Sequence, residues 1–241
     1  MKYLITVEYD GSKYFGLQKL NDKKTIQGEL EKVLSKIDEK PVQVKAASRT
    51  DRGVHALNQK CHFSLEKSIT PYRLRYYLNR STDNGIFIKD CKVIEDDNFH
   101  ARFSAKSKTY IYKINTGEYS TINNDYLYNY NRHIDIKKLR QISKCFIGQH
   151  NYKSFVTGKH RTYDSIIEKI KILQKRSIIY IEIKGLAFYT YMVRNIVSIM
   201  ILYSENKISK KDVIDMIENQ KKILEYSPAP ACGLYLKEIE Y

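Results

Sequence analysis

The segment VQVKAASRTDRGVHALNQKCHFSL (residues 42–65) sets a polar turn between two stretches whose apolar residues alternate as in strands. The turn itself, ASRTDRGVHA (residues 47–56), places one carboxylate, Asp51, among two arginines and a histidine. Neighbouring cations keep a carboxylate ionised, and an ionised, oriented carboxylate can act as a nucleophile. The alternative is a surface turn in which Asp51 caps backbone N–H groups and the arginines are solvated.

Amphipathic helices are predicted on both sides of this segment. Residues 26–37 carry apolar side chains at helical spacing after Thr25, a suitable N-cap. Thr70 and Pro71 supply the N-cap and first residue of a second helix. With strands at residues 3–9 and 86–93, the order is β-α-β-β-α-β, the ferredoxin-like pattern.

The second part of the chain predicts the same order of elements again. Expected are a strand at 108–115, a helix from Asp135, strands at 166–173 and 178–183, a long helix at 192–203, a shorter helix from Ser209 and a last strand at 234–241. We therefore predict an α+β protein of two ferredoxin-like half-domains, residues 1–105 and 106–241. Their antiparallel sheets are expected to join around a central cleft, and the excess of Lys and Arg over Asp and Glu predicts that this cleft is basic and binds RNA.

Composition indicates a polyanionic partner. The 241 residues include 42 Lys and Arg against 27 Asp and Glu, a formal net charge of +15, which favours RNA or an acidic membrane surface. The N-terminus resembles a strand and not a signal peptide, and no apolar run is long enough to span a bilayer, so we expect a cytoplasmic protein without a membrane partner. The four cysteines are far apart and lack a C-x-x-C pair, which indicates reduced thiols and neither a metal site nor disulfides.

Six further motifs, taken with the turn, resemble the tRNA pseudouridine synthase A family. In order along the chain these stretches are YDGSKYFGLQ (9–18), TIQGEL (25–30), RTDRGVHA (49–56), FHARFSA (99–105), YIY (110–112), MVRNIV (192–197) and APACGLYL (229–236). A single short motif arises by chance, whereas several in register over nearly the whole chain are specific.

The resemblance implies an isomerase that converts uridine to pseudouridine in structured RNA, most simply the anticodon stem-loop of tRNA. It also implies a homodimer. The reaction exchanges one bond for another within a nucleotide, so it needs neither a metal nor an organic cofactor. Two alternatives remain open: a divergent paralogue that modifies ribosomal RNA, and a non-catalytic RNA-binding protein.

The family's catalytic residues are carried over position by position. Asp51 stands at the essential aspartate, as nucleophile or base; Arg49 lies near the vacancy left by the extruded base; Tyr110 stacks on the target uracil; and Arg194 is the expected partner of Asp51. Tyr110 could instead belong to the core, where we place Tyr112. Arg194 could instead extend to solvent along its helix.

Arg52, His55 and Arg102 are the expected phosphate contacts because they lie within matched motifs. Other positive residues, Lys13, Lys106, Lys108, Lys159 and Arg161, are generic candidates. The chain departs from the family at Leu17, Ser48 and Tyr191, where tryptophan, glycine and histidine are common. Because Asp51, Tyr110 and Arg194 are retained, the resemblance implies that the chemistry is retained, while surrounding residues select the uridine.

Overall fold

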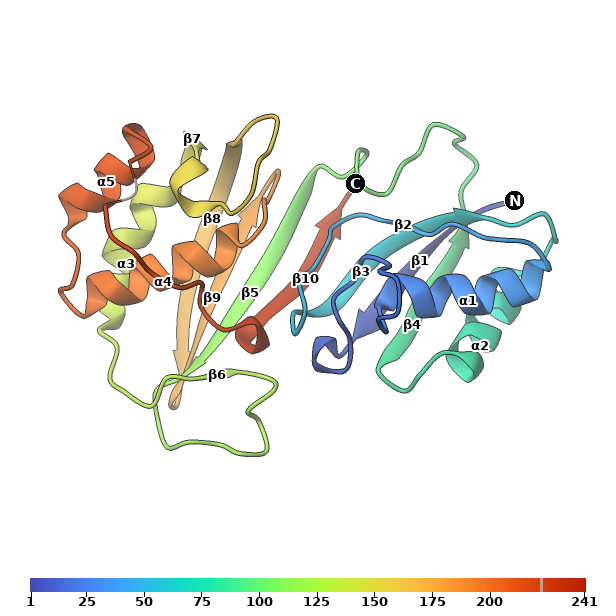
Figure 1. Ribbon diagram of the computed structural model, residues 1–241, viewed down its shortest axis with the longest axis horizontal. Coiled ribbons are helices and arrows are strands. Elements are labelled where there is room, and N and C mark those ends of the chain that lie inside the picture. Colours follow the sequence, from blue (N-terminus) through green and yellow to red (C-terminus); the bar gives the residue numbers. More distant parts are fainter. Residues whose placement is uncertain (222) are drawn as a thin grey trace. The chain divides into compact units, whose positions relative to one another are not determined.

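Two units make up the computed structural model, which describes residues 1–221 and 223–241 (Figure 1). Unit 1 comprises Met1–Lys106 and Tyr235–Tyr241, and unit 2 comprises Ser107–Leu234. The division after Lys106 lies beside the boundary expected near residue 105. The last strand, expected in the second half, lies with unit 1 because it pairs with a strand of that unit.

Unit 1 has the expected element order. Its elements are β1 (Lys2–Tyr9), α1 (Ile26–Asp38), β2 (Lys45–Ala46), β3 (His55–Ser64), α2 (Pro71–Ser81), β4 (Ile86–Val93) and β10 (Leu234–Glu240). Within this unit the strands follow the order β4-β1-β3-β10, and β2 also pairs with β3. The β1–β3, β1–β4 and β2–β3 pairs are antiparallel, whereas β10 runs parallel to β3.

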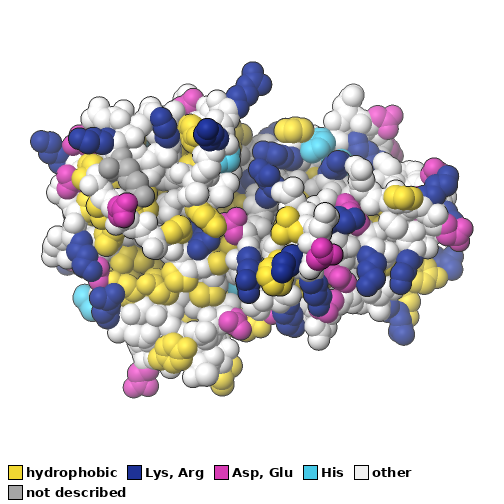
Figure 2. Space-filling view, in the orientation of Figure 1, with side chains coloured by type: hydrophobic (Ala, Val, Ile, Leu, Met, Phe, Trp, Pro, Cys, Tyr) yellow, Lys and Arg dark blue, Asp and Glu magenta, His cyan; other side chains and the backbone are white. Residues whose placement is uncertain are grey.

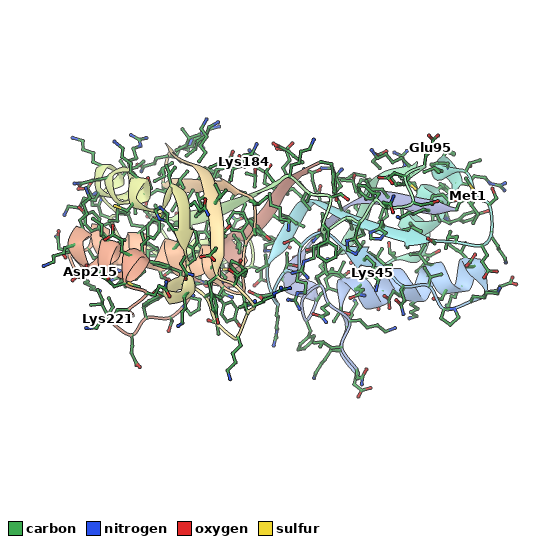
Figure 3. All side chains as sticks on the ribbon, turned by 90° about the horizontal axis from the view of Figure 1, so that it is seen from above. Met1, Lys45, Glu95, Lys184, Asp215 and Lys221 are labelled. Carbon is green, nitrogen blue, oxygen red and sulfur yellow. The ribbon has the colours of Figure 1, made fainter. Side chains whose placement is uncertain are left out.

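Alternating residues of β1 and the apolar sides of the helices form the core of unit 1. Ile5 and Val7 on β1, Leu30 on α1, and Leu74 and Leu78 on α2 are all 0% exposed. Each such side chain contributes about 1.5–3 kcal/mol when it leaves water. The predicted caps are present, since Thr25 accepts from the Gly28 N–H and Thr70 from the Arg73 N–H. Figure 3 shows α1 along one face of this sheet, beside Lys45.

The strand expected at residues 42–46 is shorter than predicted and contains only Lys45–Ala46. The backbone N–H groups of Val42 and Val44 donate to side chains of helix α1 and not to a neighbouring strand. The Val42 N–H donates to Ser35 Oγ at 2.9 Å, and the Val44 N–H donates to Glu31 Oε1 at 3.0 Å. Side chains of α1 therefore accept the backbone hydrogen bonds that a neighbouring strand would accept if β2 were longer.

Unit 2 is also a mixed α and β structure. It contains β5 (Ser107–Asn115), β6 (Tyr128–Asn129), α3 (Ile136–Ser143), β7 (Gly148–Asn151), β8 (Asp164–Lys175), β9 (Ile178–Gly185), α4 (Met192–Ser204) and α5 (Lys210–Glu218). The strands β5, β9, β8 and β7 form an antiparallel series in that order, and β6 runs parallel to β5. The long elements follow the expected sequence, while β6 and β7 are short strands that periodicity did not predict.

Several local features of unit 2 match the sequence. Asp135 caps α3, and Ser209 forms a capping box with Asp212 at the start of α5. The tyrosine-rich segment 126–133 contributes the two-residue strand β6, and Tyr130 is buried. Within the residues that the structure describes, no helix is both long and apolar enough to cross a membrane.

Helix α2 protects the free edge of β4 in unit 1. The Asn79 side chain donates to Ile88 O at 3.0 Å and accepts from the Ile88 N–H at 2.7 Å. The Arg75 guanidinium donates to the next exposed carbonyl, that of Lys89, at 3.2 Å. One amide thus imitates a neighbouring strand, a device that blocks pairing with another chain.

Replacing Asn79 with alanine should destabilise unit 1 by about 1–3 kcal/mol, because both backbone groups of Ile88 lose their partner. Urea denaturation followed by circular dichroism measures this change. Ser81→Ala, at the exposed end of the same helix, should change stability by less than about 0.5 kcal/mol. Equal stability of the two variants would contradict the role given to Asn79.

Candidate active site

The loop around Asp51 is a tight turn whose two arginines are exposed. The Val54 N–H donates to the Asp51 carbonyl at 3.1 Å, and Gly53 has a φ of 79°. A glycine at the third position permits this turn, since a side chain disfavours positive φ. Asp51 is half-buried, whereas Arg49 and Arg52 are exposed.

Two glycines of the N-terminal motif bring its backbone directly against this turn. A Cβ on Gly11 would lie 2.0 Å from Val54 O, and one on Gly16 would lie 3.1 Å from Thr50 O. Gly16 also has a φ of 90°. Hydrogen bonds continue the contact, since the Leu17 N–H donates to Thr50 O at 3.1 Å. The motif at residues 9–18 therefore positions the Asp51 turn.

Neutral buried side chains fix the start of the turn. The Tyr9 hydroxyl and Thr50 Oγ1 lie 2.6 Å apart. Gln59, which is 0% exposed, donates to Ser48 O at 2.7 Å and accepts from the Ser48 N–H at 3.2 Å. Leaving such buried groups unpaired costs about 1–3 kcal/mol each. Sequence reasoning missed Gln59, whose only signal was a polar residue within an otherwise strand-like run.

His55 is 3% exposed, which favours a structural role over the phosphate contact expected from the sequence. Its Nδ1 accepts from the Gly11 N–H at 3.1 Å and lies 3.4 Å from Asp10 Oδ1. The ring stacks on Tyr235 of β10, with centroids 4.5 Å apart.

The two arginines of the turn make contacts with the N-terminal motif at residues 9–18. The Arg52 guanidinium carbon lies 4.4 Å from the centre of the Phe15 ring. Arg49 Nη1 donates to Gln18 Oε1 at 3.3 Å. A cation over an aromatic ring keeps its charge while it loses some freedom of movement. Both arginines remain accessible to a polyanion.

Arg102 occupies an exposed turn elsewhere in unit 1. Its guanidinium carbon lies 5.7 Å from the centre of the Phe103 ring, and Phe103 is 77% exposed. Behind this turn, the Ala101 N–H donates to His62 Nδ1 at 3.1 Å. Burial lowers the pKa of His62 to about 4, so this histidine is neutral at physiological pH.

Tyr110 lies on β5 of unit 2 and is 5% exposed. Its ring packs edge to face on Phe188, with centroids 5.0 Å apart. Tyr112 is 0% exposed and donates to Pro230 O at 2.6 Å. Tyr112 therefore belongs to the core, as predicted.

Arg194 lies in the first turn of α4 and is half-buried. Its Nε donates to Ala229 O at 2.6 Å, and its guanidinium carbon lies 4.7 Å from the centre of the Tyr191 ring. A cation in the first turn is disfavoured by the helix dipole. A nearby anion would offset this unfavourable interaction, so an arginine at this position is suited to facing an anion.

Other candidates divide between the surface and the interior. Lys13 donates to Asn84 Oδ1 at 3.2 Å, Lys108 is buried, and Lys106, Lys159 and Arg161 are exposed.

Burial raises the pKa of the Cys61 and Cys91 thiols to about 12. No group of three or more His, Cys, Asp or Glu side chains is arranged to hold a metal ion in the described part of the chain.

Residues 5–104 and 142–241 match the sequence profile of the tRNA pseudouridine synthase family. The chain belongs to this family. It is 40% identical to tRNA pseudouridine synthase A of Malacoplasma penetrans over 243 residues, which cover 100% of both chains. It is 30% identical to tRNA pseudouridine synthase A 2 of Bacillus cereus over 246 residues, which cover 99% of both.

This membership confirms the enzyme class that the motifs indicated, a pseudouridine synthase and hence an isomerase. Among solved structures, a chain of a Cbf5–Nop10–Gar1 complex matches with a TM-score of 0.35 and 11% identity over 82% of this chain and 53% of that chain. That likeness is too low to inform the fold.

Gly11→Ala should lower the rate of pseudouridine formation about 100-fold, because the added methyl group displaces the Asp51 turn and small misplacements of reacting groups cost rates of this order. Affinity for RNA should fall by a much smaller factor, because only Arg49 and Arg52 among the proposed RNA contacts move with the turn. A pseudouridine assay and a binding assay on the same variant measure both effects.

Ser12→Ala serves as the control, because it removes only an exposed hydroxyl that donates to Asp10 Oδ1 at 2.6 Å. It should retain nearly full activity. Wild-type turnover by Gly11→Ala would show that the close approach of Gly11 to Val54 has no catalytic importance.

Proposed function

We propose that this chain converts uridine to pseudouridine in the anticodon stem-loop of tRNA, with Asp51 as the essential nucleophile or base. The observation that carries this proposal is the fixed turn around Asp51. Four backbone or buried side-chain contacts, from Gly11, Leu17, Tyr9 and Gln59, hold the turn. A carboxylate on so constrained a backbone is suited to attack at a defined atom.

The proposed reaction balances within the substrate nucleotide. The bond from sugar C1′ to uracil N1 breaks, a bond from C1′ to C5 forms, the proton on C5 leaves and N1 gains a proton. No atom is added and no electron is transferred, so neither a metal nor an organic cofactor is required. A uridine in a stacked stem must first leave the helix, and a basic enzyme surface supports that step.

We propose that Tyr110 and Arg194 act on the same nucleotide as Asp51. The Tyr110 ring is assigned to stacking on the uracil, and Arg194 to pairing with the Asp51 carboxylate. Support for Arg194 comes from its position in the first turn of α4, where a cation benefits from a nearby anion. Its Nε contact with Ala229 orients the guanidinium group.

We propose that Arg49, Arg52 and Arg102 bind the RNA, and that His55 positions the turn from behind. The three arginines are exposed, whereas His55 is buried and accepts from Gly11. Arg49 remains assigned to the vacancy left by the extruded base. We further propose two ferredoxin-like half-domains, from the order of the predicted elements, and a cytoplasmic location, from the sequence of the N-terminus and the lack of a long apolar run. A homodimer is proposed from the family resemblance.

Asp51→Asn should abolish pseudouridine formation while it leaves RNA affinity within a few-fold of wild type, because the amide keeps the shape but loses the charge and basicity of the carboxylate. Pseudouridine mapping of RNA from cells that lack this gene, incubated with purified protein, measures turnover and names the substrate. Asp22→Asn, an exposed acid of unit 1, is the matched control and should retain full activity.

The map also separates the alternatives. Modification confined to ribosomal RNA would replace the tRNA proposal with the alternative of a divergent paralogue that modifies ribosomal RNA. If the wild-type protein binds RNA but forms no pseudouridine, the hypothesis of a non-catalytic RNA-binding protein replaces that of an enzyme. Turnover by Asp51→Asn would refute the central assignment.

Arg52→Ala should weaken RNA binding and lower the slope of log affinity against log salt by about one, because a phosphate contact releases about one counterion. Binding titrations at several salt concentrations measure that slope. Lys32→Ala, which removes one exposed charge from α1, is the control. An unchanged slope for Arg52→Ala would remove Arg52 from the RNA contacts.

A further inference from the structure

Helix α2 carries an exposed set of aromatic and basic side chains that the proposed active site does not use. Its sequence, PYRLRYYLNRS, contains three arginines and no acidic residue. Tyr72 is 72% exposed, Tyr76 is 51% exposed and Tyr77 is 43% exposed. Large aromatic groups at these exposures cost free energy in water and are common in binding surfaces.

Helical spacing explains why these side chains form one surface. Leu74 and Leu78, four residues apart, are buried against the core. Tyr72, Tyr76 and Arg80 follow one another at the same spacing and are all exposed. We call Tyr72, Arg73, Tyr76, Tyr77 and Arg80 the Tyr–Arg face.

Contacts within the face hold its rings and charges together. The Arg80 guanidinium carbon lies 5.7 Å from the centre of the Tyr76 ring, and Arg80 Nη1 donates to the Tyr76 hydroxyl at 3.4 Å. The rings of Tyr76 and Tyr77 meet edge to face, with centroids 6.1 Å apart. Lys and Arg side chains gather on unit 1 over α1 and α2 (Figure 2).

The C-terminal end of α2 leads directly to the segment that supports the Asp51 turn. Asp83, just beyond α2, accepts from the Tyr14 hydroxyl at 2.9 Å and from Lys24 Nζ at 2.6 Å. Gly85 lies against Tyr14 so closely that a Cβ there would be 2.7 Å from the hydroxyl oxygen. Contacts of Asp83 and Asn84 therefore join the end of α2 to residues 13–24, and the Phe15 ring of that segment contacts Arg52.

Acids along this path are paired with lysines. The hydrogen bond from Lys24, with others from Gly85 and Tyr14, lowers the pKa of the Asp83 carboxyl to about 2, so this acid is ionised and paired. Lys13 lies beside Asn84. Lys24 pairs with Asp83, and Lys13 Nζ lies 4.0 Å from Asp10 Oδ2, so these two lysines offset the acids that lie between the Tyr–Arg face and Arg52.

We propose that the Tyr–Arg face of α2 is a second RNA-binding surface, which holds nucleotides of the substrate other than the one that reacts. This inference rests on the proposed function. The tyrosine rings stack on unpaired bases, and Arg73 and Arg80 neutralise phosphates. Stacking tolerates every base, so this surface adds affinity and places the RNA without selecting its sequence.

Charge distinguishes RNA from a second copy of the chain as the occupant. Self-association through this face about a two-fold axis would bring arginines of both copies together, and α2 supplies no carboxylate to compensate them. RNA supplies both the negative charge for the arginines and the flat surfaces for the tyrosines.

Two double variants of the full chain test the proposal separately for rings and charges. Tyr72→Ser with Tyr76→Ser should raise the dissociation constant for a tRNA transcript about 30-fold or more, the effect of losing two stacked bases. Arg73→Gln with Arg80→Gln should lower the salt slope by about two. In both, KM for the RNA should rise while kcat is unchanged.

Matched controls come from unit 2. Tyr119→Ser removes one tyrosine that is 59% exposed, and Lys210→Gln with Lys211→Gln removes two charges from α5. Thermal unfolding should be the same for all variants. Double variants that bind RNA as the controls do, with the same salt slope, would overturn the proposal.

Sedimentation and turnover complete the test. A change in association state with unchanged RNA affinity would also overturn the proposal, by assigning the face to contact between copies. If wild type forms no pseudouridine, the proposed function fails by itself, because dissociation constants and salt slopes still decide whether the Tyr–Arg face binds RNA.

Discussion

The close contact between the backbone at Gly11 and Gly16 and the Asp51 turn is the constraint on which the site depends. Gly11 has no room for a side chain, because a Cβ there would lie 2.0 Å from Val54 O, and Gly16 has a φ of 90°, which side chains disfavour, with Thr50 O only 3.1 Å from its Cβ position. The two segments lie about forty residues apart in sequence, on the ends of β1 and β3, which pair along most of their length. Pairing of these strands therefore brings the glycines to the turn, and the folded sheet itself orients Asp51.

Neutral groups hold this turn, and that choice has an electrostatic consequence. Tyr9, Thr50 and Gln59 form the buried contacts, all through uncharged hydrogen bonds. An ion pair in their place would incur a desolvation penalty and would alter the potential at Asp51. These hydrogen bonds therefore place no charge of their own beside Asp51. Arg49 and Arg52 of the same turn are exposed.

Most elements could be predicted from the sequence because their signals are local. Thr25, Thr70 and Ser209 cap helices as expected, and the alternation in β1 and β5 marks strands. Errors arose where a distant partner decides the outcome. Residues 42–44 look like a strand, yet Ser35 and Glu31 of α1 take their N–H groups. His55 looks like a phosphate ligand from its neighbours in sequence, but Gly11 and Tyr235, far away in the chain, enclose it. Asp51 was predictable as a candidate, whereas the contacts that fix it were not.

Tyr191 shows how a departure from the family pattern can preserve a site. Its φ of 63° is unusual for a residue with a side chain and costs on the order of 1–3 kcal/mol. It stands at the N-cap of α4 but accepts no capping hydrogen bond through its side chain. Its ring instead lies under the Arg194 guanidinium group, 4.7 Å from ring centre to guanidinium carbon. A histidine ring at this position could offer the same flat face, so the exchange retains the support for Arg194 although the residue type differs. The strained backbone at Tyr191 places its ring on the same turn as Arg194. The ring therefore orients the guanidinium group at the N-terminus of α4, the helix end that disfavours a cation.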